Sequence, residues 1–348
     1  MAQNLPHYLE ITETSGISIS HFLKKNNYSK VFVLIDENTG HYCLPLISEY
    51  IGEYFKIEIR SGEVYKTLQT CETIWQALTD EEADRSALLI NLGGGVIGDM
   101  GGFCASTYKR GIDFVNIPTT LLAQVDAGIG GKLGVDFNGF KNHIGLFRFP
   151  SKVIIDPWFL KTLPPNEIRS GFAEMLKHAF IKDTGYLKQL TELNLEENHW
   201  RLLIEKSILL KNEIVEADPE EKGERQYLNF GHTVGHAIET HFLESGKPIL
   251  HGEAVAAGMI AEAFLSEKCT GLSKDSRDEL VQIVDNYFTR IDIQEQDVIK
   301  ILVNMEQDKK NMGTNIQAVL LTKLGEARHS VTISKEDVHE ALAFYGIK

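Results

Sequence analysis

Short, almost uninterrupted apolar runs in the first half of the chain restrict the fold more than any other feature. Residues 30–36 (KVFVLID) and 86–92 (SALLINL) are the clearest runs, and residues 114–118 and 152–156 repeat the pattern. Strands of a parallel sheet look like this, because helices bury both of its faces. We therefore predict an open, Rossmann-like α/β sheet, whose ligands bind at the carboxyl ends of the strands.

The second half of the chain has a different pattern. From residue 166 to about residue 310 the apolar residues recur with helical spacing, and Pro164 and Pro165 mark the break before the first helix. A length of 348 residues is long for a single core. We predict an α/β domain over residues 1–160 and a mainly helical domain over residues 161–348.

Bulk composition excludes several classes of function. With 43% hydrophobic and 24% charged residues the chain is typical of a globular protein. A net charge of -14 argues against a nucleic-acid partner, and an anionic substrate would need a local cluster of cations. The chain has no apolar run of membrane-spanning length and no signal-peptide pattern at its start. Its 4 scattered cysteines predict reduced thiols and a cytoplasmic protein.

A glycine-rich turn follows the second apolar run. Residues 93–99 (GGGVIGD) leave the predicted strand and open a helix. Glycines let a pyrophosphate approach the backbone, and the start of a helix offers N–H donors. A tight strand-to-helix turn without a ligand is the alternative, but its place after a buried strand favours nucleotide binding. Polar residues near the ends of other strands, Asp36, Asn38, Glu63 and Lys66, are candidates to bind the adenosine hydroxyls.

Two lysines and an asparagine lie in a second glycine-rich stretch. Lys132 follows Gly130 and Gly131, and Lys141 precedes Asn142. We expect these side chains on loops, where they suit an anion such as phosphate or carboxylate. An ordinary solvated surface loop is the alternative.

Four of the 12 histidines fall within a short segment of the second half. Residues 228–239 read LNFGHTVGHAIE, and His251 follows in the sequence HGE. His232 and His236 are spaced i, i+4, which places both rings on one face of a helix, where they suit a metal or an anion. Histidines that are simply hydrogen-bonded in a core are the alternative, since the motif itself names no third ligand.

Glu174 is a candidate for that third ligand. It shares a helical face with Lys177 at i, i+3, which alone would predict a weak surface ion pair. The apolar neighbours Phe172 and Met175 instead predict a buried helix, where a carboxylate without a partner is costly. A Glu–His–His set with Glu174, His232 and His251 is the pattern of a catalytic zinc site with an open position.

Taken together, these motifs resemble the 3-dehydroquinate synthases of the sugar-phosphate cyclase superfamily. The resemblance runs from Asp36 to the segment 308–310 and therefore covers most of the chain. The motifs occur in family order: GGGVIGD, RG, PTTLLAQVD, GGK, KN, AExxK, LNFGHTxGHAIE and LHGE. Any one of them is suggestive, and the ordered set is highly specific.

The resemblance implies a reaction and its cofactors. The family converts 3-deoxy-D-arabino-heptulosonate 7-phosphate into 3-dehydroquinate and phosphate, a step of the shikimate pathway toward chorismate and the aromatic amino acids. NAD removes a hydride from C5 and later returns it, which permits phosphate elimination, ring opening and an intramolecular aldol closure. The resemblance further implies one divalent metal, zinc or alternatively cobalt, and a cytoplasmic homodimer with its active site between the two domains.

The resemblance also implies roles for individual residues. The metal ligands correspond to Glu174, His232 and His251. The NAD-binding positions correspond to Asp36, Asn38, Glu63, Lys66, Gly94, Gly95, Asp99, Thr119, Thr120, Lys132 and Lys141. The substrate-binding positions correspond to Arg110, Lys132, Asn142, Lys177, Lys211, Arg225, Asn229, His236 and Lys309 or Lys310. The catalytic positions correspond to Asp126, Lys132, Asn142, Lys177 and His236.

Some positions depart from the family pattern. Ala127 and Gly128 stand where hydroxyl side chains are common, Leu133 replaces a common Thr, and Asp136 replaces a common Asn. We expect the lost hydroxyls to weaken contacts with the cofactor or the substrate.

Three other functions compete with this interpretation. The first is a sister cyclase that makes a valiolone or an inosose. Such enzymes differ at the carboxylate-binding positions, and the dehydroquinate interpretation is favoured by Lys211, Arg225, Asn229, His236 and the segment 308–310 (DKK). The second is a net alcohol or glycerol dehydrogenase with a similar two-domain plan. The third is a metal-stabilised scaffold without activity, which leaves the glycine turn and the lysines unexplained.

Overall fold

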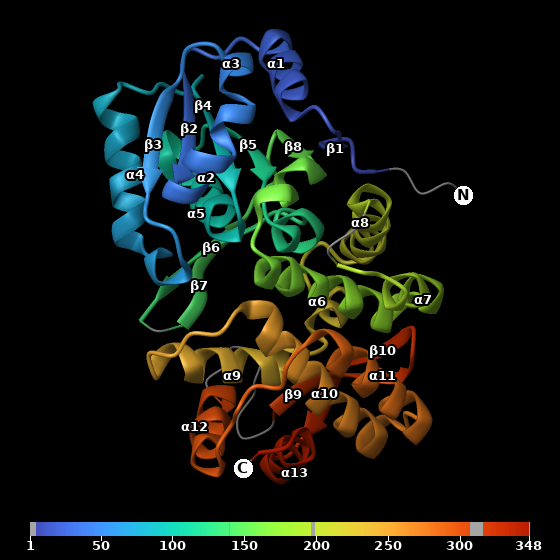
Figure 1. Cartoon of the computed structure of the whole chain (residues 1–348). Helices are drawn as coiled ribbons and strands as arrows, with labels where there is room; N and C mark the ends of the chain where they lie inside the picture. Colours follow the sequence, from blue (N-terminus) through green and yellow to red (C-terminus); the bar gives the residue numbers. More distant parts are fainter. Residues whose placement is uncertain (1–4, 139, 196–198, 307–315, 348) are drawn as a thin grey trace. The chain divides into compact units, whose positions relative to one another are not determined.

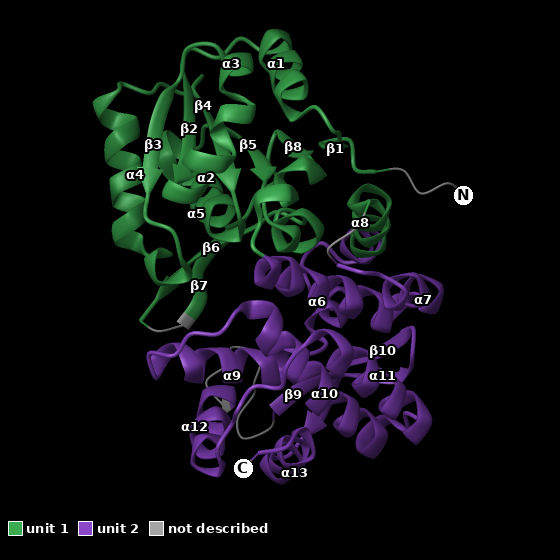
Figure 2. Cartoon of the chain, in the orientation of Figure 1, with its two compact units in different colours: residues 1–164, 199–212 green, residues 165–198, 213–348 purple. Residues whose placement is uncertain are grey.

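The computed structural model describes residues 5–138, 140–195, 199–306 and 316–347. They divide into two compact units (Figure 2). Unit 1 comprises residues 1–164 and 199–212, and unit 2 comprises residues 165–198 and 213–348. None of the described helices combines the length and hydropathy that a membrane crossing requires.

Unit 1 is an α/β structure, as predicted (Figure 1). Its strands are β1 (Leu9–Ile11), β2 (Val31–Asp36), β3 (Phe55–Ile59), β4 (Leu88–Gly93), β5 (Asp113–Pro118), β6 (Lys132–Phe137), β7 (Phe140–Phe147) and β8 (Lys152–Ile155). Its helices are α1 (Ser15–Lys25), α2 (Glu37–Tyr42), α3 (Ser48–Ile51), α4 (Leu68–Asp80) and α5 (Gly95–Thr107). Residues 200–212 of helix α8 (Trp200–Ala217) also belong to this unit.

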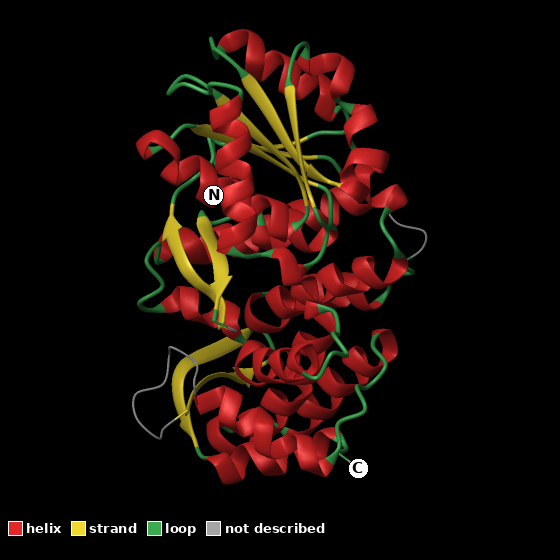
Figure 3. Ribbon diagram, turned by 90° about the vertical axis from the view of Figure 1, so that its left-hand side faces the viewer, coloured by secondary structure: helices red, strands yellow, loops and turns green. Residues whose placement is uncertain are grey.

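Six of these strands form one parallel sheet in the order β1-β8-β5-β4-β2-β3. The four predicted strands are β2, β4, β5 and β8, and all lie inside the sheet, while β1 and β3 form its edges. Helices cover both faces (Figure 3). Successive residues of β2 alternate between two cores: Phe32 and Leu34 pack toward α4 and α5, and Val33 and Ile35 pack on the opposite face. This explains the uninterrupted apolar runs.

The second glycine-rich stretch is a hairpin and not a loop. Strands β6 and β7 pair antiparallel, with Leu133 opposite Leu146 and Val135 opposite Ile144. Leu133 and Val135 are buried in the core that contains α4 and α5. The expectation of loops for Lys132, Lys141 and Asn142 was therefore wrong, because the alternation of apolar residues with these polar ones is a strand pattern.

Unit 2 is mainly helical, as predicted. Its helices are α6 (Pro165–Lys182), α7 (Thr184–Thr191), α9 (His232–Glu244), α10 (His251–Thr270), α11 (Lys274–Tyr287), α12 (Glu295–Glu306) and α13 (Lys335–Tyr345). Strands β9 (Ile316–Lys323) and β10 (Glu326–Ile333) form an antiparallel hairpin. Helix α10 is central: it packs on α6, α9, α11 and α13, and most of its side chains are buried.

Candidate active site

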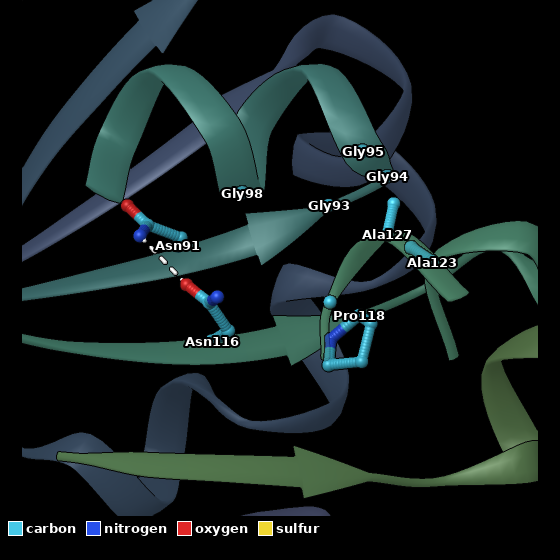
Figure 4. A pocket seen from close by; sticks show the side chains of 10 residues that line it. Asn91, Gly93, Gly94, Gly95, Gly98, Asn116, Pro118, Ala123 and Ala127 are labelled. Carbon is cyan, nitrogen blue, oxygen red and sulfur yellow. Dashed lines mark hydrogen bonds between the residues drawn. The ribbon is translucent and has the colours of Figure 1, made fainter. Parts of the chain in front are cut away.

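The glycine turn of unit 1 opens onto a pocket at the carboxyl ends of β4 and β5 (Figure 4). The pocket is lined by Asn91, Gly93, Gly94, Gly95, Gly98, Asn116, Pro118, Ala123, Ala127 and Gly128. Helix α5 starts at Gly95, so its first N–H groups lie at the pocket. A Cβ atom on Gly94 would lie 3.0 Å from Thr120 Cγ2, a tight contact that favours glycine in the turn. The geometry suits a phosphate group.

Two asparagines that sequence reasoning missed also line this pocket. Asn91 Nδ2 donates a hydrogen bond to Asn116 Oδ1 at 2.8 Å, across the neighbouring strands β4 and β5 (Figure 4). A Cβ atom on Gly101 would lie only 1.9 Å from Asn91 Oδ1, so the glycine of α5 makes room for the amide. The signal in the sequence was a polar residue inside each of two otherwise apolar strands.

Lys66 is the centre of a buried polar cluster in unit 1. The residue is only 3% exposed, and its Nζ lies 2.6 Å from Asp99 Oδ2 and 2.7 Å from Asn142 Oδ1. Burial alone would lower the pKa of Lys66, but the carboxylates of Asp99 and Glu63 outweigh burial and raise it. Lys66 is therefore a permanent cation. Lys141 lies beside the cluster, with its Nζ 3.6 Å from Glu63 Oε1.

The other predicted cofactor residues are spread along the strand ends. Asp36 caps helix α2 by accepting a hydrogen bond from the Thr39 N–H, and Asn38 is exposed in that helix. Thr119 is buried, and its N–H donates to Gly93 O at 3.0 Å. This bond joins the residue after β5 to the glycine turn.

In unit 1, the predicted substrate residue Lys211 forms an ion pair with the predicted catalytic residue Asp126. Lys211 Nζ lies 2.6 Å from Asp126 Oδ1, and both side chains are largely buried. Asp126 lies in a π-helical turn (Ala123–Ala127). Arg110 and Lys132 have exposed side chains, and Arg110 adopts a left-handed φ of 70°.

In unit 2, three helices carry the predicted metal ligands: Glu174 on α6, His232 on α9 and His251 on α10. Glycines bring the three backbones close together. A Cβ atom on Gly252 would lie 2.2 Å from Ser170 O of α6, and one on Gly258 would lie 1.9 Å from Gly231 O. A Cβ atom on Gly235, between His232 and His236, would lie 2.8 Å from Ala254 O of α10, which explains the glycine inside the histidine motif.

The three side chains converge on one point. Glu174 Oε1 lies 3.4 Å from His232 Nε2 and 3.4 Å from His251 Nε2. Tetrahedral zinc with bonds of about 2.0–2.1 Å separates its ligand atoms by about 3.3–3.4 Å. The observed separations therefore fit one small divalent cation.

Hydrogen bonds on the far side of each ring identify the ligand atoms. His232 Nδ1 lies 3.1 Å from Phe230 O, so it must carry the proton and donate it. Burial lowers the pKa of His232, which keeps the ring neutral and leaves a lone pair on Nε2. Nε2 faces the carboxylate of Glu174, and a cation between the two would be coordinated by both. The residues therefore fit a metal.

His251 is oriented by a residue that sequence reasoning left without a role. Glu239 Oε2 lies 3.2 Å from His251 Nδ1, and Glu239 is only 6% exposed. Burial alone would lower the pKa of His251, but Glu239 and Glu174 outweigh burial and raise it to about 10. A carboxylate behind a ligating histidine fixes its ring and increases its basicity. The Glu at the end of GHAIE was the available signal.

His236 and Lys177 lie next to this cluster. The ring centroids of His232 and His236 are 4.9 Å apart, and those of His236 and His251 are 5.7 Å apart. The ring nitrogens of the three histidines offer ligand atoms within 4.8 Å of one another. Lys177 is 1% exposed and pairs with Glu174 through Oε2, so the carboxylate contacts the lysine with one oxygen and the histidines with the other.

Two more predicted residues of unit 2 lie in the segment before α9. The guanidinium of Arg225, only 1% exposed, donates to Pro219 O at 2.7 Å. Asn229 Nδ2 donates to Glu221 Oε1 at 3.0 Å. Lys309 and Lys310 lie outside the described residues.

The structure accounts for the departures from the family pattern. Leu133 fills space over Gly102, where an added Cβ atom would lie 2.4 Å from Leu133 Cδ2. The carboxylate of Asp136 accepts a hydrogen bond from the Asn142 N–H at 2.7 Å, which ties β6 to β7 beside Lys66. Ala127 and Gly128 line the pocket of the glycine turn, so this pocket lacks the side-chain hydroxyls that are common at these two positions.

Solved structures of sugar-phosphate cyclases have the same fold. One is 2-deoxy-scyllo-inosose synthase complexed with carbaglucose-6-phosphate, NAD+ and Co2+, with a TM-score of 0.82, 22% identity, and coverage of 96% of this chain and 95% of that one. Another is 2-epi-5-epi-valiolone synthase from Streptomyces hygroscopicus with NAD+ and Zn2+ bound, with a TM-score of 0.83, 22% identity, and coverage of 99% and 98%. The fold is that of a sugar-phosphate cyclase.

Sequence comparison identifies the family within the class of sugar-phosphate cyclases. Residues 56–170 match the family model of the 3-dehydroquinate synthase N-terminal domain, and residues 171–311 match that of its C-terminal domain. The 3-dehydroquinate synthase of Parabacteroides distasonis is 41% identical over 333 residues, which cover 94% of each chain. That of Clostridium beijerinckii is 43% identical over 309 residues, with coverage of 86% and 87%. The chain belongs to the 3-dehydroquinate synthase family.

Proposed function

We propose that this chain catalyses the 3-dehydroquinate synthase reaction, as a carbon–oxygen lyase that eliminates phosphate. Its substrate is 3-deoxy-D-arabino-heptulosonate 7-phosphate, and its products are 3-dehydroquinate and inorganic phosphate. The family membership supports this reaction over that of the sister cyclases, which are only 22% identical. The observation that carries the proposal is the convergence of Glu174 Oε1 on the Nε2 atoms of His232 and His251.

Unit 1 would hold the cofactor and unit 2 the metal. The pocket at Gly94 and Gly95 suits the pyrophosphate of NAD, with Thr120 packed against the turn. The donor set Glu174, His232 and His251 suits zinc, with cobalt as the alternative. When bound, NAD+ accepts and returns a hydride at C5, and the metal acts as a Lewis acid on the substrate hydroxyls.

Buried cations would bind the anionic groups of the substrate. Phosphate and carboxylate groups are repelled by a chain with a net charge of -14, so the cations must be local. Lys177, Lys211 and Arg225 are at most 5% exposed. Desolvated cations form strong, charge-assisted hydrogen bonds with such oxygens. Arg110, Lys132, Asn142 and Asn229 complete the proposed substrate set among the described residues.

Proton movement is assigned to groups near the metal ligands. His236 lies on α9 one turn after the ligand His232, and its ring is also near that of His251 on α10. An imidazole can hold or release a proton near neutral pH. Lys177 balances the charge of Glu174 and offers further N–H donors to a bound oxyanion. Asp126, paired with Lys211, keeps that lysine in place.

The test measures products and cofactor together. With NAD+ and Zn2+ present, purified protein should release phosphate and 3-dehydroquinate in equal amounts from the heptulosonate phosphate, without accumulating NADH. Steady NADH accumulation would instead identify a net dehydrogenase. Parallel assays with sedoheptulose 7-phosphate separate the synthase from a sister cyclase, and turnover of that sugar alone would refute the proposal.

A homodimer in the cytoplasm is a further part of the proposal, carried over from the family resemblance. Sedimentation equilibrium of the purified chain checks the oligomeric state. A single species with the mass of one chain, 39.1 kDa, would contradict the dimer.

A further inference from the structure

Helix α9, which carries two of the proposed site residues, begins without a cap of its own. Its N-cap residue is Gly231, with a φ of 80° and no side chain to accept a hydrogen bond. The third residue of the helix, Val234, is apolar. A capping box needs a polar side chain at both positions, so neither half of one can form locally.

A carboxylate from another helix takes the place of both side chains of a capping box. Glu262 of α10 accepts a hydrogen bond from the Gly231 N–H with Oε2, at 2.6 Å, and one from the Val234 N–H with Oε1, at 3.0 Å. These are the two N–H groups that a capping box satisfies. The Glu262 side chain is completely buried, and its charge lies at the positive end of the α9 dipole.

Close packing explains why the cap comes from α10. A Cβ atom on Gly231 would lie 2.6 Å from Met259 Cγ and 3.0 Å from Val255 O. The left-handed φ also favours glycine. The residue before His232 therefore cannot carry a capping side chain, while α10 passes directly over the turn.

We propose that Glu262 is a positioning residue for the metal site, an inference that rests on the proposed function of Glu174, His232 and His251. His232 is the first residue of α9, and its Nδ1 lies 3.1 Å from Phe230 O. The direction of its Nε2 therefore depends on the turn at 230–231, which Glu262 holds. Burying a carboxylate to stabilise a helix alone is unfavourable compared with an ordinary local cap. Fixing the geometry of a ligand accounts for that cost.

The test replaces Glu262 by Gln and measures Zn2+ binding to the metal-free full-length protein, by competition with a chromophoric chelator. The amide keeps one acceptor and turns a donor toward an N–H group. We expect the Kd for Zn2+ to rise about 10–100-fold, the range for outer partners of metal ligands. The absorption spectrum of the Co2+-substituted protein should change, and amide hydrogen exchange at Gly231 and Val234 should become faster.

Ser334→Ala is the matched control. Ser334 caps α13 in a capping box with Asp337, and α13 carries none of the proposed site residues. This variant should lose helix capping in the same unit and keep the Kd for Zn2+ and the Co2+ spectrum of the unchanged protein. An equal loss of Zn2+ affinity in the control would overturn the positioning role, as would faster exchange in Glu262→Gln with unchanged Zn2+ binding.

Glu262→Asp keeps the test decisive if the Gln variant does not fold. The shorter side chain retains the charge and reaches only one of the two N–H groups, so intermediate Zn2+ affinity is expected, and unchanged affinity would overturn the inference. The experiment measures Zn2+ affinity and not turnover. If the protein does not catalyse the proposed reaction, the effect of Glu262 on Zn2+ affinity can therefore still be judged. An unchanged protein that bound no Zn2+ would overturn the inference together with the metal site.

Discussion

Glu239 determines which atom His251 presents. With Nδ1 bonded to the Glu239 carboxylate, the ring can offer Nε2 alone to the point where Glu174 and His232 meet. His232 is held in the same way by the carbonyl of Phe230. The two rings are therefore oriented by different groups, one charged and one neutral.

Changing Glu239 to Gln tests this arrangement. The amide is a weaker acceptor and carries no charge, so the ring loses orientation and basicity. We expect Zn2+ affinity to fall about 10–100-fold, with the fold retained. Chelator competition gives the affinity, and Glu244→Gln, an exposed change near the end of the same helix, is the control. Equal Zn2+ affinity in Glu239→Gln and Glu244→Gln would show that Glu239 has no role in metal binding.

Replacing a ligand itself has a larger effect. Glu174→Ala and His251→Ala should each lose bound zinc and turnover, and their affinity should fall by more than the about 100-fold typical of outer partners. Metal analysis after gel filtration checks the content. His339→Ala, which removes an exposed histidine of the same unit, should retain a full complement of metal. Normal metal content in either ligand variant would refute the assignment.

At the scale of elements, two glycines of helix α5, Gly98 and Gly101, differ in the space around them. A Cβ atom on Gly98 would meet only Asn116 Nδ2, at 3.9 Å, in ordinary contact. One on Gly101 would clash with Asn91 Oδ1. Gly98 is therefore open toward the pocket, while Gly101 is filled by the chain itself.

Gly98→Ala should separate cofactor binding from stability. The methyl group occupies the pocket, so we expect NAD+ to bind about tenfold more weakly, which corresponds to about 1.4 kcal/mol. Alanine also favours the helix by about 0.5–1 kcal/mol relative to glycine, so the free energy of unfolding should not fall. Calorimetric titration and urea unfolding measure the two quantities, and Gly101→Ala should show the reverse pattern. Unchanged NAD+ binding by Gly98→Ala would place the cofactor elsewhere.

The elements also show where sequence reasoning succeeds and where it stops. Strands β2 and β4 were predictable because burial on both faces leaves a continuous apolar run. The β6–β7 hairpin was missed, because its glycines and lysines were interpreted as a loop although Leu133 and Val135 alternate with polar residues as in a strand. Glu174 could be inferred from local burial, whereas the roles of Glu239 and Glu262 depend on helix packing that no local pattern reports.

For the whole molecule, the two ligands should protect different parts of the chain. The glycine-turn pocket lies entirely in unit 1, and the Glu–His–His cluster lies entirely in unit 2. A ligand stabilises the structure to which it binds, by about 2.7 kcal/mol at 100 times its Kd. NAD+ should therefore slow hydrogen exchange mainly in α5, and Zn2+ mainly in α6, α9 and α10. Mass spectrometry of exchanged peptides measures this, and reversed protection would contradict both site assignments.

The division of the chain has a consequence for its synthesis. Residues 199–212 belong to unit 1, although residues 165–198, which precede them, belong to unit 2. Among residues 199–212 is Lys211, the partner of Asp126. Unit 1 cannot be completed on the ribosome until residue 212 has emerged, by which time the first helices of unit 2 are already outside. A nascent chain that ended at the first boundary, residue 164, would lack a segment of its own sheet domain, so the contacts of unit 1 can be completed only after the first helices of unit 2 have been synthesised.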